Sequence, residues 1–240
     1  MKQRKIDLNG IEIFVLDEAD RMLDMGFIRD VRKIVERLPK ERQTLLFSAT
    51  MPDAVSDLVK SLLRDHERIE VTPPATIVDR IAQKVMFVSR ENKRHLLADL
   101  LQDSAVSRVI VFTRTKHNAN RVADQLQKGG VSADAIHGNK SQNARQRSLA
   151  GFKNGGVRVL VATDIAARGI DVDNVTHVIN FEMPMEPESY VHRIGRTARA
   201  GSEGIAISFC DQDEVKLLKA VERATRRTIP VDETHAYHAA

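Results

Sequence analysis

The sequence VLVATDIAARGID occupies residues 159–171 and opens on an apolar run of strand length. Such a run, bounded by small and polar residues, is typical of a strand that is buried on both faces. The same order, an apolar run followed by polar residues and then an amphipathic stretch of helical length, recurs along the chain. This alternation predicts an α/β protein with a mainly parallel sheet and helices on both of its faces.

The alternation is most regular after residue 81. Strands are expected there at 84–88, 108–112, 133–136, 157–161, 177–181 and 205–209. Helices are expected at 92–101, 117–127, 142–152, 188–199 and 213–223. In a parallel sheet, ligands bind beyond the carboxyl ends of the strands. The polar residues that follow the strands are therefore the first candidates for a functional site.

The first 72 residues show the same pattern in a shorter form. Strands are expected at 11–16, 44–47 and 69–71, and helices at 28–38 and from Pro52 to residue 63. The pair Pro73-Pro74 then interrupts the pattern, because proline cannot continue the interior of a strand or helix. We expect a first unit at 1–72, a linker at 73–80, a second unit at 81–227 and a loose tail at 228–240.

Composition excludes several classes of protein. A single cysteine, Cys210, rules out a disulfide framework or a cysteine-based metal site. No apolar run approaches the length of a membrane span, and none follows the N-terminus as in a signal peptide. The formal net charge of +4 permits a nucleic-acid partner without arguing for one. We expect a cytoplasmic protein without a membrane partner.

An acidic tetrapeptide, residues 17–20, directly follows the first expected strand. An aspartate–glutamate pair after a buried strand can orient hydrated Mg²⁺ beside a nucleoside triphosphate and accept a proton from the attacking water. The alternative is a solvated helix start, since carboxylates favour a helix N-terminus. The tetrapeptide alone favours that alternative.

Arginine recurs every third residue in the sequence HRIGRTAR, residues 192–199. On the helix expected there, Arg193, Arg196 and Arg199 would form one ridge of guanidinium groups. Guanidinium forks bind phosphate oxygens and stabilise charge in phosphoryl transfer. The alternative is a solvated basic face, and His192 alone is more often a packed or capping histidine than a catalytic one.

The stretch 163–171 combines small residues with polar ones after a strand. Ala166, Ala167 and Gly169 permit a close approach of backbone to a ligand. Thr163 could bind a phosphate, and Asp171 could accept a ribose hydroxyl. The alternative is a tight turn that needs small residues for packing.

Together these stretches resemble the DEAD-box family of ATP-dependent RNA helicases, in superfamily 2. The motifs that carry the resemblance are residues 15–20, 48–50, 111–113, 142–145, 163–171 and 192–201. Their order and spacing fit over nearly the whole chain, and the stretches 112–117 and 136–141 most resemble the bacterial RhlE branch. The resemblance implies the C-terminal part of a first RecA-like, ATP-binding domain at 1–72 and a complete second RecA-like helicase domain at 81–227.

The resemblance also implies ATP and Mg²⁺ as cofactors, and a role for each candidate residue. Asp17 would hold Mg²⁺ through water, Glu18 would be the catalytic carboxylate, and Arg196 and Arg199 would be arginine fingers on the γ-phosphate. The nucleotide-binding residues would be Asp171, at the ribose, and Gly169. The residues that couple the two domains would be Asp20, Ser48, Thr50 and His192. The residues on the RNA-binding face would be Phe112, Gly138, Arg145 and Thr163.

The sequence departs from the family in two places. Ala198 stands where the family usually has glycine, and one methyl group in a helix should be tolerated. No Gly-x-x-x-x-Gly-Lys motif occurs among the 240 residues, and none of the 12 glycines precedes a lysine. The family's phosphate-binding loop would precede residue 1, so we expect the latter part of a longer helicase, in which ATP and Mg²⁺ need that missing part for proper binding.

Two functions remain open at this point. The first is an RNA helicase that remodels single strands or short duplexes with low sequence specificity, since cations and backbone amides contact phosphates rather than bases. The second is a non-hydrolysing module that binds RNA, or docks on another helicase, through its second domain. A ribosome or an RNA-degradation assembly would be a further candidate partner.

We predict no appreciable ATP hydrolysis by these 240 residues alone. The triphosphate would lack its cradle of backbone N–H groups and its lysine. A phosphate-release assay on the purified chain measures this. An ATPase activity that Glu18→Gln abolishes would contradict the prediction.

Overall fold

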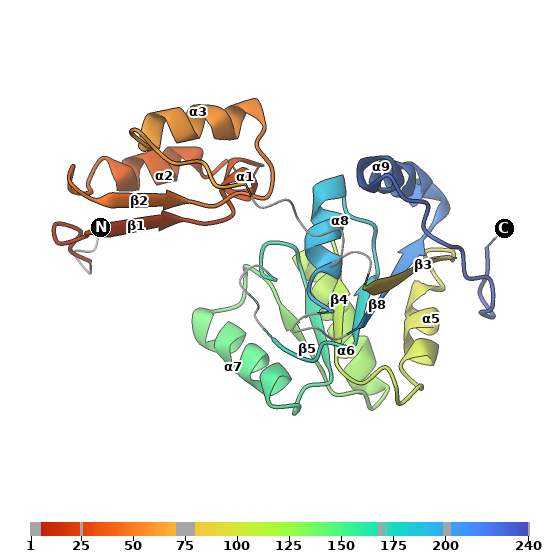
Figure 1. The fold of residues 1–240 in the computed structure, drawn as a ribbon. Coiled ribbons are helices and arrows are strands. Elements are labelled where there is room, and N and C mark those ends of the chain that lie inside the picture. Colours follow the sequence, from red (N-terminus) through yellow and green to blue (C-terminus); the bar gives the residue numbers. More distant parts are fainter. Residues whose placement is uncertain are drawn as a thin grey trace. The chain divides into compact units, whose positions relative to one another are not determined.

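The computed structural model of the chain describes residues 6–24, 26–70, 80–167, 170, 172–198 and 203–239. The chain divides into two compact units, Met1–Thr72 and Pro73–Ala240. Figure 1 shows the helices and strands of both units, and each unit is described by itself. Of the linker expected at 73–80, all but Arg80 falls outside the described residues.

The first unit combines a two-stranded parallel sheet with a layer of helices. The strands pair in register, with Ile13 opposite Gln43. Its elements are β1 (Ile13–Leu16), α1 (Ala19–Asp24), α2 (Ile28–Val35), β2 (Gln43–Leu46) and α3 (Asp53–Leu62), and the helices lie on one side of the strands (Figure 1). The strand expected at 69–71 is absent at 69 and 70, and residue 71 lies outside the described residues.

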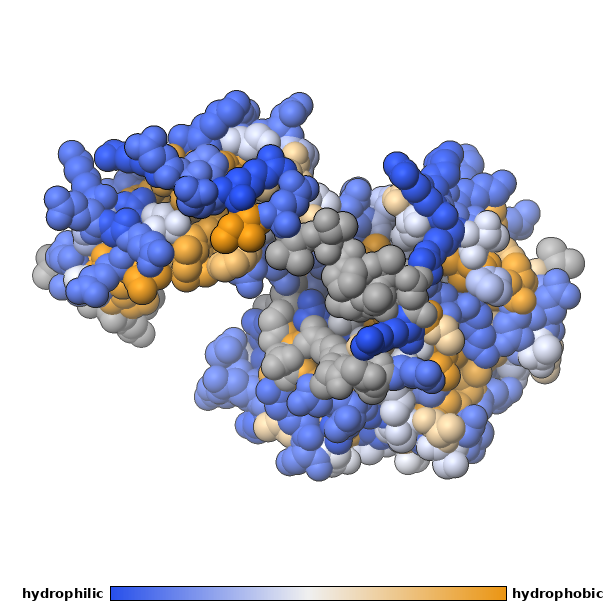
Figure 2. All heavy atoms as spheres, viewed as in Figure 1, coloured by the Kyte–Doolittle hydropathy of each residue, from blue (hydrophilic) through white to orange (hydrophobic). Residues whose placement is uncertain are grey.

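One face of this small sheet is packed and the other is exposed. Phe14 and Leu16 pack against the helices around Val55. Ile13 and Val15 point the opposite way, because side chains alternate along a strand, and they are 57% and 50% exposed. Figure 2 shows apolar side chains gathered along the strand side of this unit. The unit therefore has a core on only one face of its sheet.

The second unit is built on a six-stranded sheet in which all pairings are parallel, as the sequence predicted. The strand order is β3-β8-β7-β4-β6-β5. The strands are β3 (Ile81–Phe87), β4 (Val109–Phe112), β5 (Ala133–Ile136), β6 (Val159–Ala162), β7 (His177–Asn180) and β8 (Gly204–Cys210). Because the strands run in one direction, the loops that follow them collect at one edge of the sheet.

Helices cover both faces of this sheet, which confirms the predicted architecture. Val109 and Val111 of β4 face the helices α5 (Lys93–Leu100) and α6 (Lys116–Lys128). Ile110 and Phe112 face the opposite side. That side carries α7 (Gln142–Lys153), α8 (Pro187–Ile194) and α9 (Val215–Thr225). No helix in the described part of the chain is both long enough and apolar enough to cross a membrane.

The helix predicted at 188–199 is shorter than expected. It ends at Ile194, where the N–H of the capping residue Gly195 donates to the carbonyl of Val191. Beyond the helix, the N–H groups of Arg196 and Thr197 donate to the carbonyls three residues earlier, at 3.1 Å each, in place of the four-residue spacing of an α-helix. The prediction of one helical ridge of arginines is therefore wrong.

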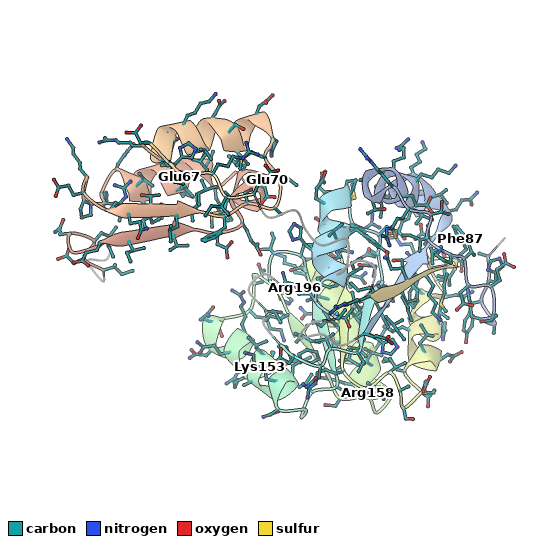
Figure 3. All side chains as sticks on the ribbon, viewed as in Figure 1. Glu67, Glu70, Phe87, Lys153, Arg158 and Arg196 are labelled. Atoms are coloured by element: carbon teal, nitrogen blue, oxygen red, sulfur yellow. The ribbon has the colours of Figure 1, made fainter. Side chains whose placement is uncertain are left out.

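The tail predicted to be loose is instead packed, at least through residue 239. Ile229 is buried, and Val85 of β3 donates to the carbonyl of Pro230 at 2.9 Å and accepts from the N–H of Asp232 at 2.8 Å. Farther along, the N–H of Ala239 donates to the carbonyl of Phe87, a residue labelled in Figure 3. The tail thus covers the edge strand β3, whose backbone groups would otherwise lack partners.

We predict that the first unit opens before the second. Its core covers one face of two strands, whereas the second unit packs both faces of six strands. Limited trypsin digestion of the full chain, read by mass spectrometry, should cut within residues 6–70 before it cuts within 81–227. Equal protection of the two units, with hydrogen exchange as slow in β1 as in β4, would contradict this.

Candidate functional site

The first two acidic side chains of the tetrapeptide lie at the carboxyl end of β1. Asp17 is exposed, and its Oδ1 accepts from the backbone N–H of Glu18 at 2.8 Å. Glu18 has a φ of 51°, a left-handed conformation that is uncommon outside glycine. The next residue, Ala19, donates to the carbonyl of Phe47 beyond β2 and fixes the turn. The turn presents both carboxylates at the strand end.

The third acidic residue, Asp20, forms a buried cluster with the triplet that follows β2. Oδ2 of Asp20, which is 5% exposed, accepts from the backbone N–H of Thr50 at 3.0 Å and from its hydroxyl at 2.9 Å. The N–H of Asp20 donates to Ser48 Oγ, which donates to the carbonyl of Thr50 at 2.7 Å. Three residues predicted to couple the domains are therefore one hydrogen-bonded group. The fourth, His192, lies on α8 of the other unit.

The carboxylates of the first unit fit a hydrated magnesium ion. Oδ2 of Asp17 has no hydrogen bond to any described residue, so it can accept from a metal-bound water. Across the described ranges, no three histidine, cysteine, aspartate or glutamate side chains form a metal-binding group. Mg²⁺ commonly uses one or two carboxylates together with waters and phosphates rather than a cage of protein ligands. The donors present suit that mode of binding.

In the second unit, Arg193 is buried at the centre of a hydrogen-bond network. It is 1% exposed, and its Nε and Nη2 donate to the two carboxylate oxygens of Asp164 at 2.6 and 2.8 Å. Its Nη1 donates to Asn180 Oδ1 at 3.1 Å and to the carbonyl of Glu182 at 2.8 Å. A bidentate ion pair of this kind offsets the free-energy cost of removing the guanidinium from water. Arg193 is therefore a structural residue.

Phe112 supports this network and is not presented to a ligand. Its ring is 1% exposed, and the guanidinium of Arg193 lies 5.1 Å from the ring centroid. A cation over an aromatic face is stabilised by the ring quadrupole. The expectation that Phe112 belongs to the RNA-binding surface is corrected, because the ring is covered by Arg193.

The remaining arginine-finger and nucleotide candidates are only partly described. Arg196 lies just beyond α8, and its Nη1 donates to the carbonyl of Ile170 at 2.9 Å (Figure 3). That bond ties the arginine to the loop that follows β6. Gly169, Asp171 and Arg199 lie outside the described residues.

The glycine-to-alanine departure at residue 198 falls outside the helix. Ala198 has a φ of 56°, a left-handed conformation. The methyl group there costs about 1–2 kcal/mol relative to a right-handed conformation, a cost that glycine does not carry. The expectation of a methyl group on a regular helix is therefore wrong, although the side chain packs in the core around α8.

Three predicted RNA-binding residues lie along the ends of β5 and β6 and the start of α7. The N–H of Thr163 donates to the carbonyl of Ile136, which brings the two strand ends together. Gly138 follows β5, and no atom lies within 4 Å of the position that a Cβ would take, so its backbone is accessible. The guanidinium of Arg145, in the first turn of α7, has no hydrogen bond or ion pair to a described residue. The N-terminus of a helix binds anions through its N–H groups and dipole.

His137 anchors this edge as a neutral side chain. It is 4% exposed, and its Nε2 donates to Asn120 Oδ1 at 2.9 Å, while its Nδ1 has no partner among the described residues. Burial, together with nearby Lys140, lowers the pKa of His137. A proton on Nδ1 would lack an acceptor, so the ring serves to position the loop.

A second buried charge network was missed in the sequence. Lys93 is 1% exposed and pairs with Glu214 and, at 3.0 Å, with Asp211. Arg114 lies 3.0 Å from Glu214 and 3.4 Å from Glu182. Burial raises the pKa of Glu214, and Lys93 opposes that rise. The Asp-x-x-Glu spacing at 211–214 is a capping-box signature that could have been recognised, but the pairing with Lys93 could not.

Comparison with protein families gives two matches. Residues 1–58 match the DEAD/DEAH box helicase family, and residues 92–201 match the helicase conserved C-terminal domain. DEAD-box ATP-dependent RNA helicase CshA of Bacillus subtilis is 44% identical over 227 residues, which cover 95% of this chain and 46% of that protein. ATP-dependent RNA helicase RhlB of Pseudomonas syringae pv. tomato is 44% identical over 94% of this chain and 57% of its own length. The chain spans about half the length of these curated relatives.

Solved structures show the same similarity. S. cerevisiae Dbp5 bound to RNA and ADP BeF3 aligns with a TM-score of 0.87 at 33% identity, covering 98% of this chain and 62% of that one. E. coli DEAD-box protein SrmB bound to regulator of ribonuclease activity A aligns with a TM-score of 0.61 at 36% identity, covering 67% of this chain and 98% of that one.

We predict that Arg193→Lys destabilises the second unit by about 3 kcal/mol, because lysine cannot bond Asp164 and Asn180 together and leaves buried groups unpaired. Urea unfolding of the full chain, followed by circular dichroism, measures the loss. Arg147→Lys, on the exposed side of α7, is the matched control and should unfold like the wild type. Equal midpoints for both variants would show that the network is dispensable.

Proposed function

Because this chain belongs to the DEAD-box family of RNA helicases, we propose that it serves in the ATP-dependent remodelling of short RNA duplexes. In this proposal, the second unit binds the RNA backbone and the first unit contributes the acidic motif of the ATP site. The activity is proposed for the whole protein, since its curated relatives are about twice as long as this chain.

The observation that carries the proposal is the arrangement of the ends of β5 and β6 beside the start of α7, an edge that we propose binds anions and call the anion-binding edge. Gly138 leaves its backbone accessible, and the helix N-terminus supplies N–H groups beside Arg145. Arg145 has no partner among the described residues, so its charge is available to a phosphate. Thr163 would complete the edge. Contacts of this kind bind phosphates without reading sequence.

The residues proposed for the nucleotide site are those that the family resemblance implies. Bound Mg²⁺ would neutralise charge on the triphosphate. Asp17 would orient the hydrated metal through its unbonded oxygen, and Glu18 would accept a proton from the attacking water. Arg196 and Arg199 would contact the γ-phosphate. The residues proposed for the nucleotide itself are Gly169 and Asp171.

Coupling between hydrolysis and RNA binding would run through the Asp20 cluster. The backbone N–H and the hydroxyl of Thr50 donate to Oδ2 of Asp20, and Ser48 accepts from the N–H of Asp20 and donates to the carbonyl of Thr50. A displacement of the acidic motif would therefore move the triplet with it. His192 would be the group of the second unit that responds.

We propose the RhlE branch on the stretches 112–117 and 136–141, a cytoplasmic location, and a ribosome or an RNA-degradation assembly as the setting. A second candidate function is a non-hydrolysing RNA-binding or helicase-docking module. It is favoured by one observation: the RNA-binding candidates all belong to the second unit, which has its own core on both faces of its sheet.

We predict that single-stranded RNA binds this chain weakly and that salt weakens the binding further, because phosphate contacts release counterions. Arg145→Gln should lower the affinity about tenfold, whereas Arg147→Gln on the same helix should change it less than about twofold. Fluorescence anisotropy of a labelled oligouridine, at two salt concentrations, measures both.

The same titration with and without ATP and Mg²⁺ separates the two functions. We expect the same RNA affinity with and without ATP, because these residues lack the phosphate-binding loop. Tightening by ATP would show a completed nucleotide site and contradict that expectation. Equal RNA affinities for the wild type and Arg145→Gln would show that Arg145 at the start of α7 does not bind RNA.

A further inference from the structure

A groove runs between α5 and α6, on the face of the second sheet opposite α7. Two adjoining cavities form it, one of about 770 Å³ and one of about 250 Å³. Both are lined by Arg94, Val122 and Gln125, so the two cavities lie next to each other. The residues proposed to bind RNA and ATP do not line either cavity.

The larger cavity carries unpaired positive charge at its rim. Lys93 and Arg114 line it but are already neutralised by the buried carboxylates described above. Arg90 and Arg121 are exposed, and neither forms an ion pair with a described residue. Glu91 is the exposed carboxylate in the lining. The rim is therefore suited to an anionic ligand.

The smaller cavity is lined largely by aliphatic side chains. Leu97, Ala98, Val122 and Leu126 form its floor. His95 stands at its border and stacks on Tyr237 of the tail, with ring centroids 6.1 Å apart. An apolar recess beside a charged rim suits a ligand with one large apolar group and several negative charges.

We propose that this groove docks an acidic segment of a partner protein, with one large apolar side chain seated between α5 and α6. Charge complementarity with Arg90 and Arg121 would orient the segment, and the recess at Ala98 would take the anchor. RNA is the less suitable occupant. The recess is lined mainly by aliphatic side chains, and the ring of His95 at its border is already stacked on Tyr237 rather than free to stack on a base.

The recess lies on the sheet face opposite α7. Leu97 and Val122, which line the recess, pack on the face covered by α5 and α6, whereas Phe152 of α7 packs on the opposite face. The larger cavity extends to residues that follow the strands, Arg114 and Glu182. The apolar anchor would therefore sit on the face opposite α7, with the acidic part of the segment nearer the strand ends.

The test is a binding titration of the full chain with a fluorescein-labelled, glutamate-rich peptide that carries one central phenylalanine. The wild type should bind it, and salt should weaken the binding. The double variant Arg90→Glu/Arg121→Glu should weaken it at least about tenfold. Ala98→Glu should weaken it similarly by filling and charging the recess, and the same peptide with serine in place of phenylalanine should bind poorly.

The matched control is Lys216→Glu/Lys219→Glu, which changes the net charge equally on exposed positions of α9. It should bind the peptide like the wild type. Equal weakening by both double variants, or equal binding of the two peptides, would overturn the proposal by showing attraction through net charge alone. A loss of oligouridine affinity in Arg90→Glu/Arg121→Glu, without loss of peptide affinity, would assign the groove to nucleic acid instead. Should the double variant melt early, Arg121→Gln, with Lys219→Gln as its charge-matched control, provides the corresponding comparison.

Discussion

The buried guanidinium of Arg193 connects the segments of the second unit on which its candidate site depends. Its bonds join α8 to the loop after β6 through Asp164 and to β7 through Asn180, and its face covers Phe112 at the end of β4. A charge this deeply buried is stable only when its N–H groups find acceptors. The strand ends are therefore held in one arrangement before any ligand arrives.

The site residues are of two kinds: buried residues that hold segments together, and residues with groups accessible to a ligand. Asp20 and Arg193 are buried, and their hydrogen bonds join neighbouring segments of the chain. Asp17, Gly138 and Arg145 stand at strand or helix ends with unbonded groups or accessible backbone. Because the buried residues hold the accessible groups in place, the site needs to rearrange less when a ligand binds.

Much of the second unit was predictable because its signals are local. The strand at Ala133–Ile136 matches the predicted bounds, and α6 and α7 match within one residue, since apolar periodicity and helix-capping residues mark them. The end of α8 carried a local signal that the prediction missed, Gly195 at the cap position with His192 and Arg193 in the last turn. The bond from Thr197 to the carbonyl of Val175, 22 residues away, could not be read from the sequence. The packed tail likewise depends on the free edge of β3.

By itself, the sequence determined the α/β class, the parallel order of elements and the kinds of polar residue that follow each strand, because these depend on short-range patterns. Only the tertiary structure decided which arginine is buried, which aromatic ring it covers and where the groove between α5 and α6 lies. Asp164 and Arg193 are 29 residues apart, and Lys93 and Glu214 are 121 apart. The partner of a buried charge is selected by strand order and packing, which residue spacing does not encode.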